Sequence, residues 1–278
     1  MAFIRAIRSH AHFVAALALA SAATPAVARG QSPEAVLQRV SAQAGEAARG
    51  VNNYTVELGF QEGVTLYAER RSPLDPFLVQ YGAQGRLGPF VTLLAFAEAV
   101  LLAVREPEAA TARRKLLSYG GVTGTSGAPA HVVKANFPTR DARTGGTRAR
   151  NVAVHYDTAT LLPRRMELFT VTGTDTTTHT VDYSDYRPVN GLQIPFQRRV
   201  VMRGVRAGTD TARARTMVNV LRAGLRREAP AERERTTQII TQLEGVLERD
   251  EMVSEVTVTS VRVNQGPPGG VRLEPLDP

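Results

Sequence analysis

The stretch that decides the fold runs from Tyr156 to Pro195 and reads YDTATLLPRRMELFTVTGTDTTTHTVDYSDYRPVNGLQIP. Short segments of alternating polar and apolar residues are separated here by turn signals, and the clearest of these is the Asn190-Gly191 pair. Such a pair supplies the positive backbone φ angles that a tight hairpin requires. Because strand follows strand with short connections, the pattern predicts an antiparallel sheet.

Further strands of this kind are predicted on both sides of the stretch, since similar alternating segments are bounded by Gly, Pro or Asp. A slip in the alternation is expected at Ser260 of the last strand. The fold class is therefore α+β, mainly antiparallel β. The predicted strands are 54–58, 64–68, 77–81, 130–137, 149–156, 164–171, 177–184, 192–202 and 256–263.

Helices are predicted at both ends of the chain and in its middle. Ser32-Pro33-Glu34 is a typical helix start and leads into an amphipathic helix over 33–48. A helical segment at about 203–250, which is inserted or appended, contains a second amphipathic helix at 230–249. Residues 89–104 are apolar almost all round a helix, and the Glu106-Pro107-Glu108 break after them predicts a helical hairpin.

The N-terminus predicts export from the cytoplasm. Two arginines, Arg5 and Arg8, precede an apolar run, and Ala26-Val27-Ala28 follows as a signal peptidase pattern. We expect residues 1–28 to be removed after Ala28, leaving one domain over 29–278 that ends in a Pro/Gly-rich tail and works in the periplasm. The sequence has no cysteine, so disulfides and thiolate metal sites are excluded.

The charge is strongly positive, with a formal net charge of +8 that comes almost entirely from arginine. Nucleic acid is not the expected partner, because an exported protein rarely meets it and no tryptophan is present to stack on bases. The positive charge is concentrated in residues 198–227, whereas residues 228–255 are rich in acids. One interpretation is a patch at Arg222, Arg226 and Arg227 that docks on anionic headgroups. The alternative is mutual neutralisation of the two segments.

The hairpin residues resemble a known family. Tyr156-Asp157, Thr160, Leu162-Pro163, Arg165 and Glu167, followed by 183–187, Val189-Asn190-Gly191 and Ile194-Pro195, are similar to the outer-membrane lipoprotein-sorting (LolA-like) group. Residues 117–133, with Tyr119, Gly121, Gly127 and Val132-Val133, resemble the single strand that precedes those hairpins. The resemblance covers about 117–200, and Leu161 departs from it because a turn glycine is common there.

This resemblance implies a strongly curved, unclosed barrel-like sheet whose concave face is covered by helices and accepts acyl chains. The implied function is a non-catalytic periplasmic carrier or chaperone for a lipid or lipoprotein, without a cofactor and with at most peripheral membrane contact. The alternative is an envelope-stress sensor or adaptor that binds a membrane-anchored protein. On the carrier interpretation the 89–104 helix is a lid, and otherwise it is ordinary core. The lid would line the cavity with Phe90, Leu94, Phe96, Leu101 and Leu102.

A catalytic or metal site is not predicted. After export the chain keeps three histidines, His131, His155 and His179, and no two of them have metal-ligand spacing. Strand parity places His179 on the face of Val181, whereas His155 lies opposite Val154 and should be exposed. No nucleophile elbow, phosphate loop or dinucleotide fingerprint is present.

Overall fold

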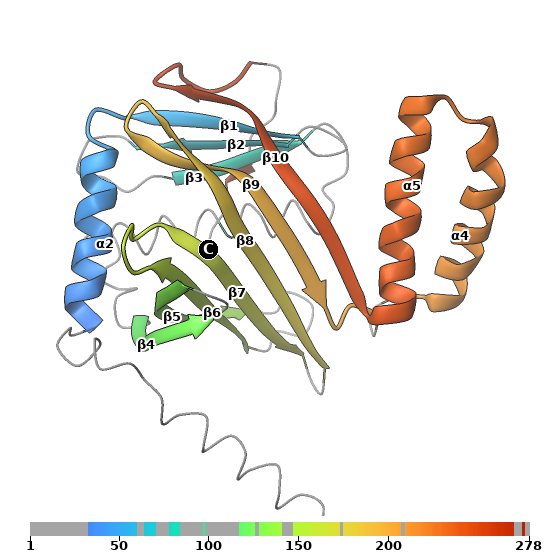
Figure 1. The fold of residues 1–278 in the computed structure, drawn as a ribbon, viewed down its shortest axis with the longest axis horizontal. Helices are drawn as coiled ribbons and strands as arrows, with labels where there is room; N and C mark the ends of the chain where they lie inside the picture. The colour runs from blue at the N-terminus through green and yellow to red at the C-terminus, as the bar shows by residue number, and fades with distance from the viewer. Residues whose placement is uncertain are drawn as a thin grey trace, which may run out of the picture.

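The computed structural model describes residues 33–59, 64–70, 78–83, 97, 117–125, 128–140, 147–172, 175–206, 209–269 and 274–275. Its eleven described strands form one antiparallel sheet in the order β11-β3-β2-β1-β10-β9-β8-β7-β6-β5-β4 (Figure 1). Strands β11 and β4 are its edges, so the sheet is open. The strands are β1 (Asn53–Gly59), β2 (Val64–Glu69), β3 (Leu78–Ala83), β4 (Leu117–Thr125), β5 (Ala128–Arg140), β6 (Thr147–Asp157), β7 (Pro163–Thr172), β8 (Asp175–Val189), β9 (Leu192–Arg203), β10 (Glu251–Val263) and β11 (Glu274–Pro275).

The turn chemistry acts as the sequence predicts. Asn190 and Gly191 both have positive φ, of 47° and 88°, and join β8 to β9. The slip expected at Ser260 is a register shift, because Glu57 pairs with Ser260 while Leu58 pairs with Val258. One expectation was wrong: residues 117–133 are not a single strand, because the chain reverses between Thr125 and Ala128 to form the β4–β5 hairpin.

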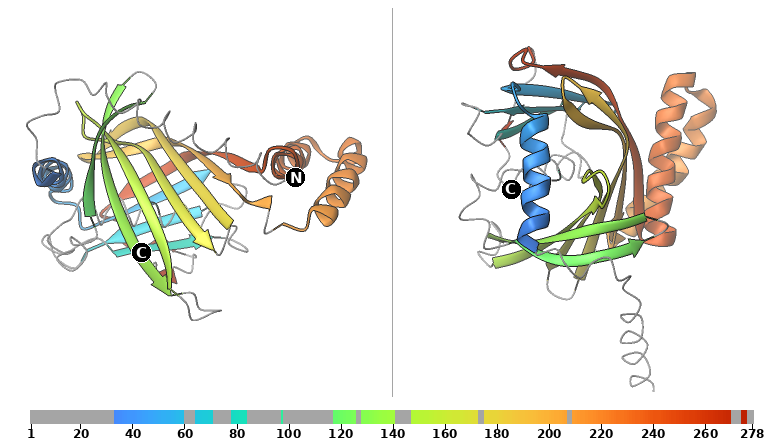
Figure 2. Two further views of the ribbon diagram at one scale, coloured as in Figure 1. Left: turned by 90° about the horizontal axis from the view of Figure 1, so that it is seen from below. Right: turned by 60° about the vertical axis from the view of Figure 1, so that its left-hand side comes forward.

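The sheet has an apolar face and a polar face. It bends so that β1–β3 lie across from β4–β6 (Figure 2). Buried side chains of β1, β2, β5 and β6 belong to one apolar cluster, so the apolar face is on the inside of the bend. Neighbouring strands bury Val154, Met166, Val181 and Val200 in one continuous core on this face. On the other face, ion pairs join neighbouring strands, and the alternation along each strand separates the two sets of side chains. These pairs are Arg199–Glu255 at 3.3 Å, Arg165–Asp182 at 2.6 Å and Arg203–Glu251 at 2.9 Å.

Helix α2 (Pro33–Ala47) spans the open side of the bent sheet, between the β1–β3 end and β4 (Figures 1 and 2). It buries Val36 and Val40, and Gln43 Nε2 donates a 2.7 Å hydrogen bond to the carbonyl of Thr160. A Cβ at Gly191 would lie 3.0 Å from the carbonyl oxygen of Ala47. The glycine therefore serves two purposes: it forms the turn and lets the end of α2 approach it.

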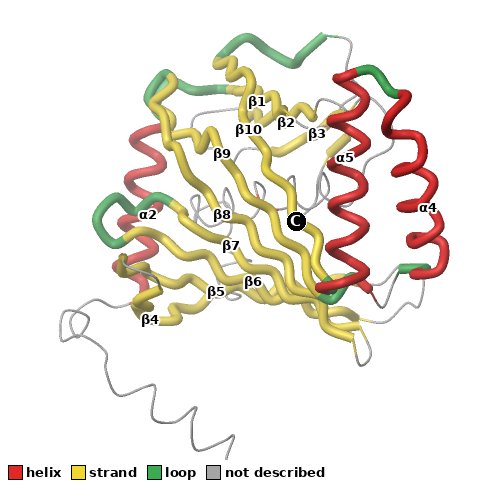
Figure 3. The backbone as a smooth tube through the Cα atoms, turned by 45° about the vertical axis from the view of Figure 1, so that its right-hand side comes forward, coloured by secondary structure: helices red, strands yellow, loops and turns green. Residues whose placement is uncertain are grey.

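The segment predicted as helical at about 203–250 forms a hairpin of two helices on the opposite side of the molecule. These are α4 (Thr211–Gly224) and α5 (Pro230–Glu244), followed by a π-helical turn over Gly245–Arg249. Asp210 caps α4 by accepting a hydrogen bond from the Arg213 amide. Unlike α2, this hairpin does not cover the apolar face of the sheet (Figure 3). No helix among the described ranges is long and apolar enough to cross a membrane.

Candidate ligand-binding face

The apolar face of the sheet is one surface of the described chain on which a ligand site could be built. Its buried side chains come from strands far apart in the sequence, including β1, β2, β5, β6, β7, β8, β9 and β10. They form one cluster together with Val40 of α2 and Ala97. The sheet, α2 and Ala97 thus share one interior, and valine is the commonest side chain in the cluster.

Ala97 is the described residue of the apolar 89–104 segment. It is helical and 1% exposed, and it belongs to the core cluster. Ala97 therefore lies in the interior of the bent sheet, which both the lid and the ordinary-core interpretations require. The five lining candidates Phe90, Leu94, Phe96, Leu101 and Leu102 lie outside the described residues. So do the signal sequence, residues 1–28, and the hairpin expected after Glu106.

A cationic side chain is embedded in this apolar face. Arg198 of β9 is 1% exposed and lies directly opposite Tyr183 of β8 and Val256 of β10. Removing a guanidinium from water is costly unless hydrogen bonds and opposite charge compensate it. Arg198 and Tyr183 both have interaction partners in the structure. The described part of this face therefore combines a large apolar area with a buried guanidinium that already has a partner.

Sequence reasoning missed Arg198, although a signal was present. Arg198 has the same parity as Val200 and Met202, which places all three on one face of the strand. The alternating set Gln197, Arg199 and Val201 is also partly apolar, so the alternation alone did not decide which set faces inward.

The three histidines His131, His155 and His179 do not form a common site among the described residues. His131 is buried and its Nδ1 lies 3.0 Å from the hydroxyl of Tyr119. Burial, with help from Arg39, lowers its pKa, although Asp157 opposes the shift. Within the described ranges no three His, Asp or Glu side chains are grouped to hold a metal ion.

His155 and His179 lie on the faces that strand parity predicts. His179 pairs with Met202 and Leu168 on the apolar face. His155 is on the polar face, but its side chain is only 12% exposed, with Nε2 3.6 Å from Glu167 Oε2. The expectation that it is exposed was wrong because a ring in mid-sheet is covered by side chains of the neighbouring strand.

The basic segment is partly neutralised. Arg222 forms an ion pair with Glu244 of α5, as the neutralisation alternative requires for that residue. Arg226 and Arg227 lie in the turn after α4, over Leu225–Arg227, and both are exposed. The three predicted docking residues therefore differ, and only the last two present unpaired charge to solvent within the described chain.

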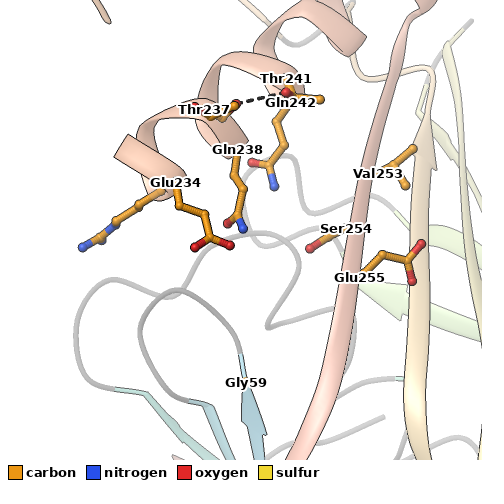
Figure 4. Close-up of a pocket in the computed structure, with 10 residues that line it drawn as sticks. Gly59, Glu234, Thr237, Gln238, Thr241, Gln242, Val253, Ser254 and Glu255 are labelled. Carbon is orange, nitrogen blue, oxygen red and sulfur yellow. Dashed lines mark hydrogen bonds between the residues drawn. The ribbon is translucent and has the colours of Figure 1, made fainter. Parts of the chain in front are cut away.

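A separate polar cleft of about 570 Å³ lies between α5 and β10, at the end of β1 (Figure 4). β1 ends at Gly59, opposite Thr257, so residues 251–256 of β10 extend beyond it. The cleft narrows toward Gly245, where an added Cβ would lie 2.5 Å from the carbonyl oxygen of Glu251. Its walls are mostly uncharged hydrogen-bonding groups, together with Glu234, Arg235 and Glu255. They come from Gly59, Glu234, Arg235, Thr237, Gln238, Thr241, Gln242, Val253, Ser254 and Glu255.

A second hollow, of about 360 Å³, lies on the polar face of β4–β7. Lys134, Asn136, Asn151 and Phe169 are among the side chains around it. Its lining mixes one lysine with amide, apolar and aromatic side chains, which does not single out one ligand class.

No protein-family model matches the sequence, and no curated protein does. Three solved structures are similar in fold. An outer membrane lipoprotein-sorting protein domain from Vibrio parahaemolyticus matches with a TM-score of 0.40 and 10% identity, over 84% of this chain and 93% of its own. A LolA superfamily protein from Nitrosomonas europaea matches with a TM-score of 0.36 and 11% identity, over 83% of this chain and 94% of its own.

The third structure is a DUF1329 family protein from Desulfovibrio piger, with a TM-score of 0.41 and 10% identity, over 86% of this chain and 96% of its own. Two of the three belong to the group that the hairpin residues resemble. The scores and identities are low, so the likeness extends to the layout of the fold and carries no activity with it.

Proposed function

We propose that this protein is a non-catalytic carrier or chaperone that holds an acyl lipid or the acyl chains of a lipoprotein inside the bent sheet. The observation that carries the proposal is the single apolar interior shared by the sheet, α2 and Ala97. Burial of an acyl chain there contributes about 0.8 kcal/mol per CH₂ and needs no reacting group. The barrel-like curvature would enclose the chain.

The proposal includes the compartment and the lid. Cleavage after Ala28 would release residues 29–278 into the periplasm, where lipoproteins and free lipids need a carrier between membranes. The 89–104 segment would close the interior through Phe90, Leu94, Phe96, Leu101 and Leu102, next to Ala97. The resemblance of the hairpin residues to the lipoprotein-sorting group supports the same function.

Ala97→Phe distinguishes a ligand cavity from a solid core. A phenyl ring at this buried site would enter a cavity and displace the acyl chain, with little loss of stability. In a close-packed core the same ring would overpack, and such substitutions cost about 1–3 kcal/mol. The expected result is a normally folded variant that no longer binds a fluorescent fatty acid.

The matched control is Ala223→Phe, since Ala223 is exposed on α4. This variant should bind the probe and unfold like the wild-type protein. If Ala97→Phe is strongly destabilised and the wild-type protein also fails to bind the probe, the interior is ordinary core and the carrier proposal is wrong. In that case the adaptor alternative, in which the protein binds a membrane-anchored partner, becomes the better one.

A further inference from the structure

Helix α4 is the outermost element of the molecule and has one side without a partner. The helix packs on α5 and on the turns at the ends of the hairpin, and it buries Ala214 and Val218 there. In Figures 1 and 3 its other side faces away from the sheet. Met217 and Val220 on that side are 43% and 66% exposed, and they are the exposed large hydrophobic residues of the described chain.

Arginines lie at both ends of this apolar pair. Arg213, Met217 and Val220 follow each other at spacings of four and three residues, so they share one side of the helix. Arg227 comes seven residues after Val220, in the turn that ends the helix, beside Arg226. From Arg213 to Arg227 this stripe is roughly 20 Å long at 1.5 Å per residue. We call these five residues the α4 face.

The charge of the α4 face is not neutralised by described residues. Helix α4 contains no acidic residue, and the acid just before it, Asp210, is used as the helix cap. Arg213, Arg226 and Arg227 are exposed and form no ion pair with any residue in the described ranges. Arg222 differs, because Glu244 of α5 neutralises it. Glu228 follows Arg227 in the turn, and its Oε1 would lie 3.9 Å from a Cβ at Gly224. The acids Glu232, Glu234 and Glu244 lie on α5.

We propose that the α4 face docks the protein on the surface of an anionic lipid bilayer. Exposed apolar side chains flanked by arginines are the composition of a helix that lies in the interface, with its apolar residues among the headgroups. Each arginine near such a surface is worth about a fivefold gain in affinity. The proposal does not depend on the carrier function, because docking requires neither the apolar interior nor a bound acyl chain.

Vesicle flotation tests the charge requirement. The wild-type protein should float with vesicles of equal parts phosphatidylglycerol and phosphatidylcholine, and not with pure phosphatidylcholine. The triple variant Arg213→Gln, Arg226→Gln, Arg227→Gln should bind about 100-fold more weakly, from three fivefold losses. The matched control removes the same charge elsewhere, by Arg39→Gln on α2, Arg49→Gln in the turn after α2 and Arg187→Gln on β8, and should stay within about threefold of wild type.

A tryptophan probe tests which side meets the lipid. The chain has no tryptophan, so Val220→Trp gives a single fluorophore on the α4 face and Ala42→Trp gives one on an exposed site of α2. Anionic vesicles should shift the emission of the first to the blue and leave the second unchanged. Equal losses of binding in the two arginine triples, or no shift at residue 220, would show only general charge attraction and would overturn the proposal.

Discussion

Leu161 has a left-handed backbone conformation, which is strained for a leucine. Substitutions at this position separate the free-energy cost of that strain from the stabilisation that the buried side chain contributes. It lies in the turn between β6 and β7 with a φ of 54°, and it is 8% exposed within the core cluster. Leu161→Ala removes the buried side chain and keeps the strain, so it should cost about 3 kcal/mol. Leu161→Gly loses the same burial but relieves the left-handed strain, which is worth about 1–2 kcal/mol.

Leu161→Gly should therefore be about 1 kcal/mol more stable than Leu161→Ala, although glycine is the smaller residue. Urea unfolding followed by circular dichroism measures both free energies of unfolding. Leu66 of β2 is the control, since it is buried in a regular strand. There glycine should be less stable than alanine, by about 0.5–1 kcal/mol. The same order at both positions would refute the strain argument.

Two further predictions concern a buried carboxylate and a close helix–strand approach. Burial alone would raise the pKa of Asp157, but hydrogen bonds from Thr160 and Ala159 and the charge of Arg164 hold it below its usual value. Its stabilisation is therefore present above the unfolded-state pKa of about 3.9 and is lost as pH falls through the lower folded pKa. Asp157→Asn should lower the free energy of unfolding at pH 7 and should reduce the fall of that free energy between about pH 5 and 2. Urea unfolding at a series of acidic pH values measures this, and a pH profile identical to that of the wild-type protein would contradict the prediction. Gly245→Ala should cost about 1–3 kcal/mol because its Cβ would meet the Glu251 carbonyl. Gly224→Ala, whose Cβ would make only an ordinary van der Waals contact of 3.9 Å with Glu228 Oε1, should be neutral or stabilising by up to about 1 kcal/mol in thermal melts, and a similar loss in both would exclude the clash.

The sheet could be predicted because its signals are local. Alternation along each strand and the Asn190-Gly191 turn need only a few neighbouring residues, and every strand expected between 130 and 202 is present. The β4–β5 hairpin was missed because two sites in the sequence suit a chain reversal, Gly120-Gly121 and Gly127. Register along a short segment does not decide between them.

The placement of side chains could be predicted only in part, because it depends on neighbours far apart in sequence. Strand parity put His155 and His179 on opposite faces, but the cover that Glu167 gives His155 comes from the next strand. Arg198 is buried by a sheet that bends round it, and no pattern within β9 reveals that bend. The pairing of Arg222 with Glu244 joins residues in different helices, so charge counting alone could not separate it from Arg226 and Arg227.

Native mass spectrometry of residues 29–278, purified from a bacterial periplasm, tests the central claim most directly. Organic extraction and lipid analysis of the same sample would identify any bound molecule. The account predicts an acyl lipid at close to one molecule per chain, and its absence from Ala97→Phe prepared in parallel. A wild-type protein that carries no lipid and also refuses acyl probes would contradict the account and leave the apolar interior as core.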